Sequence, residues 1–168
     1  KEYLDFISGI AVSNLGHRHP EIVKAIKDQI DKHMFVMVYG EFPTRIQSML
    51  AEKLSYLLPE SIDNVYFTST GTEAIEGALK LAKRFTGRHK IISFKKAYHG
   101  STHATSGLMS NDTYARAFRP FVPGVRFINY DQKESLKKIT SQTAAVIMET
   151  MQGEAGCKVA SACFMRAV

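Results

Sequence analysis

The sequence predicts an α/β fold in which a mainly parallel sheet is flanked by helices. Short apolar runs of strand length alternate with amphipathic helical segments along most of the chain, and this alternation is typical of a parallel sheet covered on both faces. The 168 residues are 45% hydrophobic and 23% charged, which is the length and balance of one globular domain. We expect an N-terminal segment with two amphipathic helices over residues 1–58 and a sheet-forming domain over residues 59–168.

In the N-terminal segment, two stretches have helical periodicity. The first opens at Pro20, a favoured residue in a first helical turn, and is expected to end near His33. The second is expected to run from about Pro43 to a stop before Pro59. Residues 34–42, between them, show no helical period.

From Asn64 onward the helical periodicity of the apolar residues ends, and a strand, a tight turn and a helix are expected in that order. Residues 65–67 form a short apolar run, and the turn follows over residues 69–71. The helix then carries acidic residues in its first turn and basic residues late, and Gly87 stands just past its expected end.

Further strands are expected at residues 91–94, 125–128 and 144–148. A short helix should separate the last two, with Asp131 and Glu134 available to cap it. Residues 100–123 form the longest stretch without firm secondary structure, apart from a helical turn expected at 114–118. Long ordered loops in compact domains are often functional.

Composition and charge narrow the functional classes. Lys and Arg outnumber Asp and Glu by 22 to 16, a formal net charge of +6, which permits attraction to anions. The basic residues are dispersed without interleaved aromatics, so we expect no nucleic-acid role. Because no run approaches the roughly 20 apolar residues of a membrane helix, and no signal-type segment opens the chain, we expect a soluble, cytoplasmic protein without a membrane partner.

Metal and disulfide chemistry are not expected. Cys157 and Cys163 lack metal-ligand spacing and are interpreted as free thiols. His17 and His19 flank Arg18 without a third ligand or a carboxylate at helical spacing, so we interpret them as part of a loop leading into Pro20.

The segment 69–74, Ser-Thr-Gly-Thr-Glu-Ala, is the most informative local motif. A turn that feeds a helix through glycine exposes backbone N–H groups at the positive end of the helix dipole, where phosphate binds. Gly71 would let the backbone approach the anion, and the hydroxyls of Thr70 and Thr72 can add hydrogen bonds. The lysine of a P-loop and the spacing of a dinucleotide motif are both missing. The alternative is that Thr70 or Thr72 only caps the helix.

Two more motifs follow expected strands and should lie on the same edge of the sheet. In Tyr98-His99-Gly100 the tyrosine can stack on a flat ring; alternatively, Tyr98 packs in the core and His99 hydrogen-bonds a loop carbonyl. Glu149 and Glu154, with an amide between them at Gln152, could orient a cationic substrate or pair with an arginine, or they are solvated loop carboxylates.

The order of these pieces resembles the class III pyridoxal-phosphate-dependent aminotransferases of fold type I, a family that includes acetylornithine, ornithine, 4-aminobutyrate and other omega-amino transaminases. The resemblance covers nearly the whole chain. The resemblance rests on four segments: the opening over residues 3–20, the turn over 67–76, Tyr98-His99-Gly100, and Glu149 with Gln152-Gly153-Glu154.

The resemblance implies that residues 59–168 are an incomplete part of the large domain of such an enzyme, with pyridoxal 5'-phosphate as cofactor and a homodimer as assembly. Together with the turn chemistry, it assigns cofactor binding to Thr70, Gly71, Thr72, Tyr98 and His99. The substrate-side residues would be Ser101, Glu154 and Tyr39. We expect Tyr39, within residues 34–42, to face a partner subunit.

The resemblance also implies a reaction, the transamination of an amine or omega-amino acid with a keto acid in the full-length enzyme. Ser101 stands where several members carry an arginine that binds a substrate carboxylate, and Ile10 stands where ornithine aminotransferases have a tyrosine. The family's Schiff-base lysine and its aspartate on the pyridine nitrogen follow the Glu149–Glu154 segment. We therefore assign no catalytic residue and expect this chain to be inactive alone. Two alternatives are a catalytically inactive phosphate-binding or interaction domain, and a related aminomutase or decarboxylase.

Overall fold

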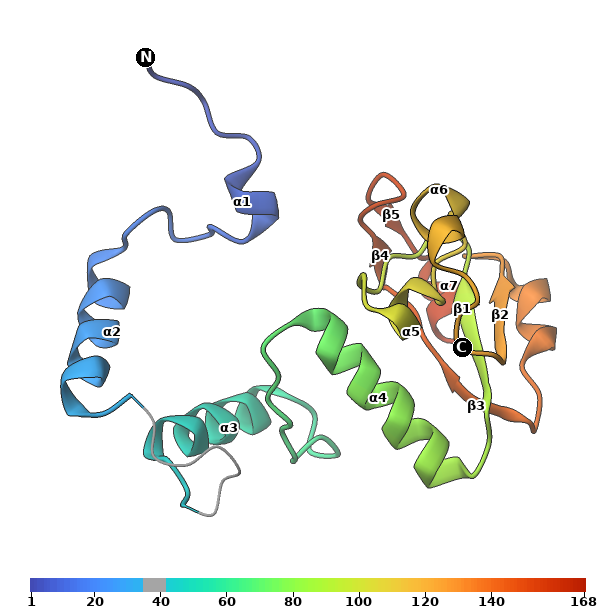
Figure 1. Ribbon diagram of the computed structural model, residues 1–168, viewed down its shortest axis with the longest axis horizontal. Coiled ribbons are helices and arrows are strands. Elements are labelled where there is room, and N and C mark those ends of the chain that lie inside the picture. The colour runs from blue at the N-terminus through green and yellow to red at the C-terminus, as the bar shows by residue number, and fades with distance from the viewer. Residues whose placement is uncertain (35–41) are drawn as a thin grey trace. The chain divides into compact units, whose positions relative to one another are not determined.

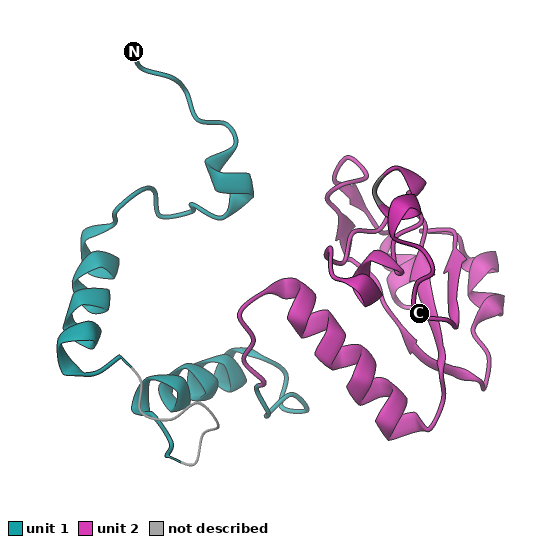
Figure 2. Cartoon of the chain, in the orientation of Figure 1, with its two compact units in different colours: residues 1–65 teal, residues 66–168 magenta. Residues whose placement is uncertain are grey.

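The computed structural model describes residues 1–34 and 42–168. The chain divides into two compact units, Lys1–Val65 and Tyr66–Val168 (Figure 2). Among the described helices, none has both the length and the apolar character needed to cross a membrane.

The first unit contains the short turn α1 (Ser8–Ala11) and the helices α2 (Pro20–Lys32) and α3 (Arg45–Leu57) (Figure 1). Both predicted helices are confirmed. Helix α2 has Pro20 in its first turn, and α3 stops before Leu58, whose extended backbone is the conformation favoured by a residue that precedes proline.

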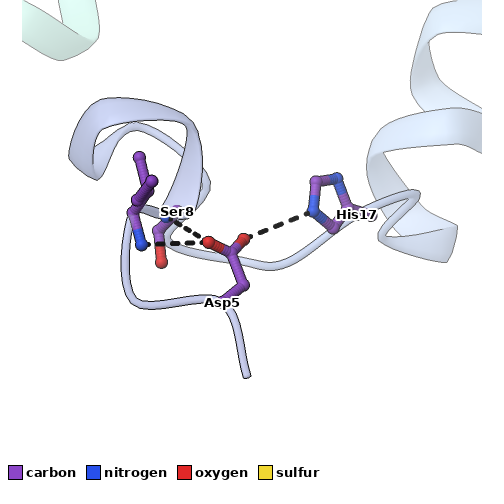
Figure 3. A network of polar contacts seen from close by, with 4 residues as sticks. Asp5, Ser8 and His17 are labelled. Atoms are coloured by element: carbon purple, nitrogen blue, oxygen red, sulfur yellow. Dashed lines mark hydrogen bonds and ion pairs between the residues drawn. The ribbon is translucent and has the colours of Figure 1, made fainter. Parts of the chain in front are cut away.

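The opening of the first unit is organised by one carboxylate (Figure 3). Oδ1 of Asp5 accepts the backbone N–H groups of Ile7 and Ser8, each at 2.9 Å, and Oδ2 lies 3.9 Å from Nε2 of His17. The backbone N–H groups of Ser8 and Ile7 lower the pKa of Asp5, and His17 adds a smaller effect. His17 therefore has a carboxylate neighbour, and the described residues contain no cluster of three potential metal ligands.

The second unit is built on a parallel sheet, as predicted, but the sheet has three of the four expected strands. Its strands β1 (Lys90–Phe94), β2 (Val125–Ile128) and β3 (Thr143–Val146) have the order β2-β1-β3 (Figure 1). Both neighbours pair with β1 in parallel. The central strand thus has a partner on each side, and four of its five residues are buried.

Side chains of β1 alternate between two apolar clusters, one on each face of the sheet. Ile91 packs with Leu79 of α4 (Gly71–Thr86) and with Leu108. Ile92 and Phe94 pack in the other cluster. That second cluster also contains residues near η2 (Lys133–Lys138) and α7 (Ala162–Met165): Ile128, Tyr130, Leu136, Ile139 and Phe164. The sheet is therefore covered on both faces.

Helix α4 follows its predicted course. Its C-terminal cap, Gly87, has a left-handed backbone with φ of 66°, and the Gly87 N–H donates to the carbonyl of Lys83. Glycine adopts this conformation without the strain that a Cβ atom would cause.

The predicted strand over residues 65–67 is wrong. The structure assigns no strand there, and the side chain of Tyr66 is 81% exposed. A strand needs a neighbouring edge to complete its backbone hydrogen bonds, and in the described structure this apolar run pairs with no sheet edge.

The predicted helix between β2 and β3 exists as the 3₁₀ helix η2, but Asp131 does not cap it. Oδ1 of Asp131 instead accepts the N–H of Ser161 at 3.0 Å and its hydroxyl at 2.7 Å. These two hydrogen bonds, the hydroxyl first, lower the pKa of Asp131. Asp131 therefore fixes the start of α7 rather than that of η2.

The stretch 100–123 contains more helix than the sequence suggested. The turn expected at 114–118 is confirmed as α6 (Asp112–Ala115) and η1 (Arg116–Phe118), whereas α5 (His103–Ser106) was not foreseen. A short antiparallel pair, β4 (Met151–Gln152) and β5 (Lys158–Val159), follows the sheet.

Candidate functional site

The first turn of α4 presents unpaired backbone donors. Thr70 is its N-cap, and the Thr70 hydroxyl oxygen accepts the N–H of Glu73 at 3.2 Å. Within the described residues, the N–H groups of Gly71 and Thr72 have no hydrogen-bond partner. Thr70 thus acts as the cap that the alternative interpretation proposed, while two donors remain at the positive end of a 16-residue helix.

Two glycines shape the space around this turn. A Cβ atom on Gly71 would meet nothing within 4 Å, so the turn borders open space. Gly100 is the opposite case: its φ is +117°, and a Cβ there would lie 2.5 Å from Oγ1 and 3.0 Å from Cα of Thr72. The absence of a side chain at Gly100 therefore lets the loop after β1 lie directly against the first turn of α4.

A network of hydroxyls joins the same two segments. Oγ1 of Thr72 lies 2.8 Å from Oγ1 of Thr102 and 2.9 Å from Oγ1 of Thr105. The hydroxyl of Thr102 donates to Oε1 of Glu76 at 2.6 Å. We call these four residues the threonine network.

Sequence reasoning missed three members of this network. The sequence identifies Glu76 only as one of the acidic residues in the first turn of the helix expected after residues 69–71. Thr102 and Thr105 fall in a stretch for which the sequence predicts no firm secondary structure, although Thr102 is of a residue type favoured at helix N-caps, which is a usable signal for the short helix α5.

The motif after β3 supports the loop after β1. Oε2 of Glu149 accepts the N–H of Tyr98 at 3.1 Å. Gln152 is almost fully buried, and its Nε2 donates to the carbonyl of Lys95 at 3.0 Å. Glu149 and Gln152 are therefore engaged with the backbone of this loop, and only Glu154 of the motif faces the cavity described next.

A cavity of about 940 Å³ adjoins the loop, and its lining includes Tyr98, Ser101 and Glu154. Lys95 and Lys96 are its basic lining residues. The side chain of Tyr98 is 47% exposed, so Tyr98 is not a core residue. The structure thus brings together three residues that the sequence assigned to the ring and to the substrate side.

Comparison with known proteins decides the family. The family model described as "Aminotransferase class-III" matches residues 1–168. The chain belongs to the class III aminotransferases. This confirms the resemblance found in the sequence.

Two relatives of this class III chain have different names. It is 40% identical over 168 residues to a [LysW]-aminoadipate semialdehyde/glutamate semialdehyde transaminase of Sulfolobus acidocaldarius, covering 100% of this chain and 43% of the relative. It is 41% identical over 170 residues to an acetylornithine aminotransferase of Bacillus subtilis, with the same two coverages. The chain therefore spans less than half the length of these relatives.

Solved structures confirm the predicted fold, part of a fold type I transaminase. An adenosylmethionine-8-amino-7-oxononanoate aminotransferase from Methanocaldococcus jannaschii matches with a TM-score of 0.90 and 28% identity, over 99% of this chain and 41% of its own. A taurine:2-oxoglutarate aminotransferase from Bifidobacterium kashiwanohense, solved in complex with PLP and glutamate, matches with a TM-score of 0.86 and 29% identity, over 99% and 43%.

The remaining predicted residues of this class III chain are placed as follows. His99 is 8% exposed, burial lowers the pKa of its imidazole, and its Nε2 has no hydrogen-bond partner within the described part of the chain. The interpretation of His99 as a donor to a loop carbonyl is therefore not supported at Nε2. Tyr39 lies outside the described residues. Cys157 and Cys163 are exposed free thiols, as predicted.

Proposed function

We propose that the protein carrying this chain is a pyridoxal 5'-phosphate-dependent transaminase that exchanges an amino group between an amine or omega-amino acid and a keto acid. Family membership supports the general reaction. One observation carries the proposal. At Gly100, the loop that contains Tyr98 packs against the first turn of α4, where the backbone N–H groups are unpaired among the described residues. Residues 59–168 would be part of the domain that holds the cofactor.

The residues present fit a flat, phosphorylated cofactor. Gly71 borders open space, and the N–H groups of Gly71 and Thr72 would receive the phosphate at the positive end of the helix dipole. Thr70 supports them as the N-cap, and the ring of Tyr98, a half-exposed residue, would stack on the pyridine ring. His99, kept neutral by burial, would line the cofactor without adding charge.

Once bound, the cofactor would supply an electron sink for the substrate carbon that loses its proton. The described residues would bind the cofactor and orient it. Holding the phosphate and the ring at two separate points removes the rotational freedom that the reacting groups would otherwise have to lose. On the substrate side, the carboxylate of Glu154 would attract a cationic amine, whereas Lys95 and Lys96, which line the same cavity, would attract an anionic group. Tyr39 would complete this side from the subunit interface of a homodimer.

The stacking role of Tyr98 predicts a difference between two substitutions. Stacking is worth about 0.5–1.5 kcal/mol beyond area burial, so Tyr98→Ala should weaken cofactor affinity severalfold. Tyr98→Phe keeps the ring and should be nearly silent, which a fluorescence titration with pyridoxal phosphate measures. Equal losses in both variants would show that the hydroxyl matters instead of the ring face.

Ser101 predicts the substrate preference. Serine cannot make the bidentate contact of an arginine with a carboxylate, a contact worth about 1.5–3 kcal/mol, or more than tenfold in affinity. The lysines that line the cavity are point charges without that geometry. The wild type should therefore accept amines and omega-amino acids better than N-acetylornithine, and Ser101→Arg should gain activity toward N-acetylornithine in a donor panel.

The matched control for this substitution is Ser101→Lys, which adds the charge without the fork of donors and should gain less than Ser101→Arg. A wild type already selective for N-acetylornithine would contradict the proposed preference.

The reaction itself is tested by following both products. The protein expressed from its complete reading frame, supplied with pyridoxal phosphate, an amine donor and a keto acid, should convert the keto acid to its amino acid in step with loss of the donor. With an amino acid in place of the amine, release of carbon dioxide without consumption of the keto acid would identify a decarboxylase, and formation of an isomeric amino acid would identify an aminomutase. Cofactor binding without turnover would favour the non-catalytic alternative.

A further inference from the structure

We propose that Glu76, Thr102 and Thr105 are positioning residues that lock the Tyr98 loop onto the first turn of α4, and that Thr72 binds the cofactor phosphate through its N–H alone. This inference rests on the proposed function, because it specifies how the two cofactor-holding segments are kept in register. It follows from the number of protons available in the threonine network.

Each hydroxyl in the network has one proton to donate. The proton of Thr102 goes to the carboxylate of Glu76, which has no proton of its own when ionised and accepts at 2.6 Å. The contact of 2.8 Å between the hydroxyls of Thr72 and Thr102 must therefore be donated by Thr72.

The neighbouring hydroxyl, that of Thr105, has several acceptors within reach. Thr105 is fully buried, and its hydroxyl lies 3.2 Å from the carbonyl of Thr102 as well as 3.0 Å from the Thr102 hydroxyl. Because Thr72 gives its single proton to Thr102, the contact of 2.9 Å between the Thr72 and Thr105 hydroxyls is donated by Thr105. The proton of Thr72 is thus used inside the network, and its oxygen further accepts the N–H of Thr102 at 3.4 Å. The Thr72 hydroxyl therefore has no proton left to donate to a phosphate oxygen.

The position of the network explains what it does. Thr72 and Glu76 are one turn apart on α4, while Thr102 and Thr105 flank the start of α5, directly after the Tyr98-His99-Gly100 motif. Their hydrogen bonds span 26 to 33 residues of sequence, and Gly100 provides the close approach that they require. Glu149 holds the same loop from its other side through the N–H of Tyr98. The network therefore fixes where the Tyr98 ring lies relative to the phosphate site.

A double-mutant cycle tests this role in the protein expressed from its complete reading frame, with pyridoxal phosphate and inorganic phosphate as probes. Thr102→Val should weaken pyridoxal phosphate binding about three- to tenfold, no more than Tyr98→Ala does, because it acts by misplacing that ring. In the Tyr98→Ala background the same substitution should cost less than about twofold. Inorganic phosphate, measured by its competition with the cofactor, should bind equally well to wild type and to Thr102→Val.

The role of the Thr72 hydroxyl is separated by the same two probes. Thr72→Val should resemble Thr102→Val, with weaker pyridoxal phosphate binding and unchanged inorganic phosphate binding. A loss of about tenfold or more for inorganic phosphate in Thr72→Val alone would show that the hydroxyl donates to phosphate, and would overturn this part of the inference.

The controls keep folding effects apart from positioning. Thr102→Ser retains the hydroxyl and should restore wild-type affinity, and Thr113→Val, an exposed threonine outside the network, should change nothing. If Thr102→Val destabilises the fold, Glu76→Ala at the partly buried end of the network provides the second arm of the cycle. Additive losses in the cycle would overturn the inference and leave the proposed function intact, whereas failure of the wild type to bind pyridoxal phosphate would overturn both.

Discussion

Gly100→Ala is expected to destabilise the fold by about 2–5 kcal/mol and to abolish cofactor binding. A positive φ costs a residue with a Cβ about 1–2 kcal/mol, and an extra carbon forced into a packed contact costs about 1–3 kcal/mol more. At Gly100 both apply, because φ is +117° and the new Cβ would lie 2.5 Å from Oγ1 and 3.0 Å from Cα of Thr72. The backbone of α4 cannot yield as a flexible side chain would, so the loop itself must move away.

Two other glycines separate these causes in urea denaturation. Gly156 has φ of +91° with no atom within 4 Å of its virtual Cβ, so Gly156→Ala measures the backbone cost alone. Gly153 has no positive φ and equally open surroundings, so Gly153→Ala should be nearly neutral. If Gly100→Ala cost no more than Gly156→Ala, the close approach of the two segments would be refuted.

Gly71→Val is expected to separate cofactor binding from folding. The Cβ at this position would meet open space, so the fold should tolerate a side chain. That space is where we place the phosphate, and each charge-assisted hydrogen bond that valine prevents is worth about 1.5–3 kcal/mol. Pyridoxal phosphate affinity should therefore fall by more than tenfold while the thermal midpoint changes little.

The control for Gly71→Val is Gly153→Val, which adds the same side chain at another open glycine. Pyridoxal phosphate titrations of the two variants should differ by at least tenfold in affinity. Similar affinities would remove the turn of α4 from the site, and a greater loss in Thr72→Val than in Gly71→Val would reverse the assigned order of importance.

The elements that the sequence predicted correctly are those whose signals are local. Helix α2 begins with a proline, and α4 ends at a glycine in the left-handed conformation; such caps act within one turn. The three paired strands were also predicted, because buried parallel strands form short apolar runs bounded by polar residues. These signals require no knowledge of distant segments.

The errors concern features that depend on a distant partner. The apolar run 65–67 looks like the others, yet no described edge pairs with it. Asp131 precedes η2, yet its carboxylate binds Ser161, 30 residues later. Sequence patterns identify a residue's potential partners by type, and only the fold selects among them.

The site shows the same division. Motif order placed Tyr98, Ser101 and Glu154 on one edge, and the structure brings them to one cavity. The order of motifs in the sequence could not show that the carboxylate of Glu149 accepts the backbone N–H of Tyr98, nor that the hydroxyl of Thr72 hydrogen-bonds the hydroxyl of Thr102. These contacts cross between segments whose spacing in the sequence is irregular.

The central claim, that the first turn of α4 receives the phosphate of the cofactor, is tested most directly by amide NMR of protein labelled with ¹⁵N at glycine and threonine. On addition of pyridoxal phosphate, the amide signals of Gly71 and Thr72 should shift, because their N–H groups gain a charged acceptor. Pyridoxal without phosphate should leave them in place. Unchanged signals for both residues in the presence of bound pyridoxal phosphate would contradict the account.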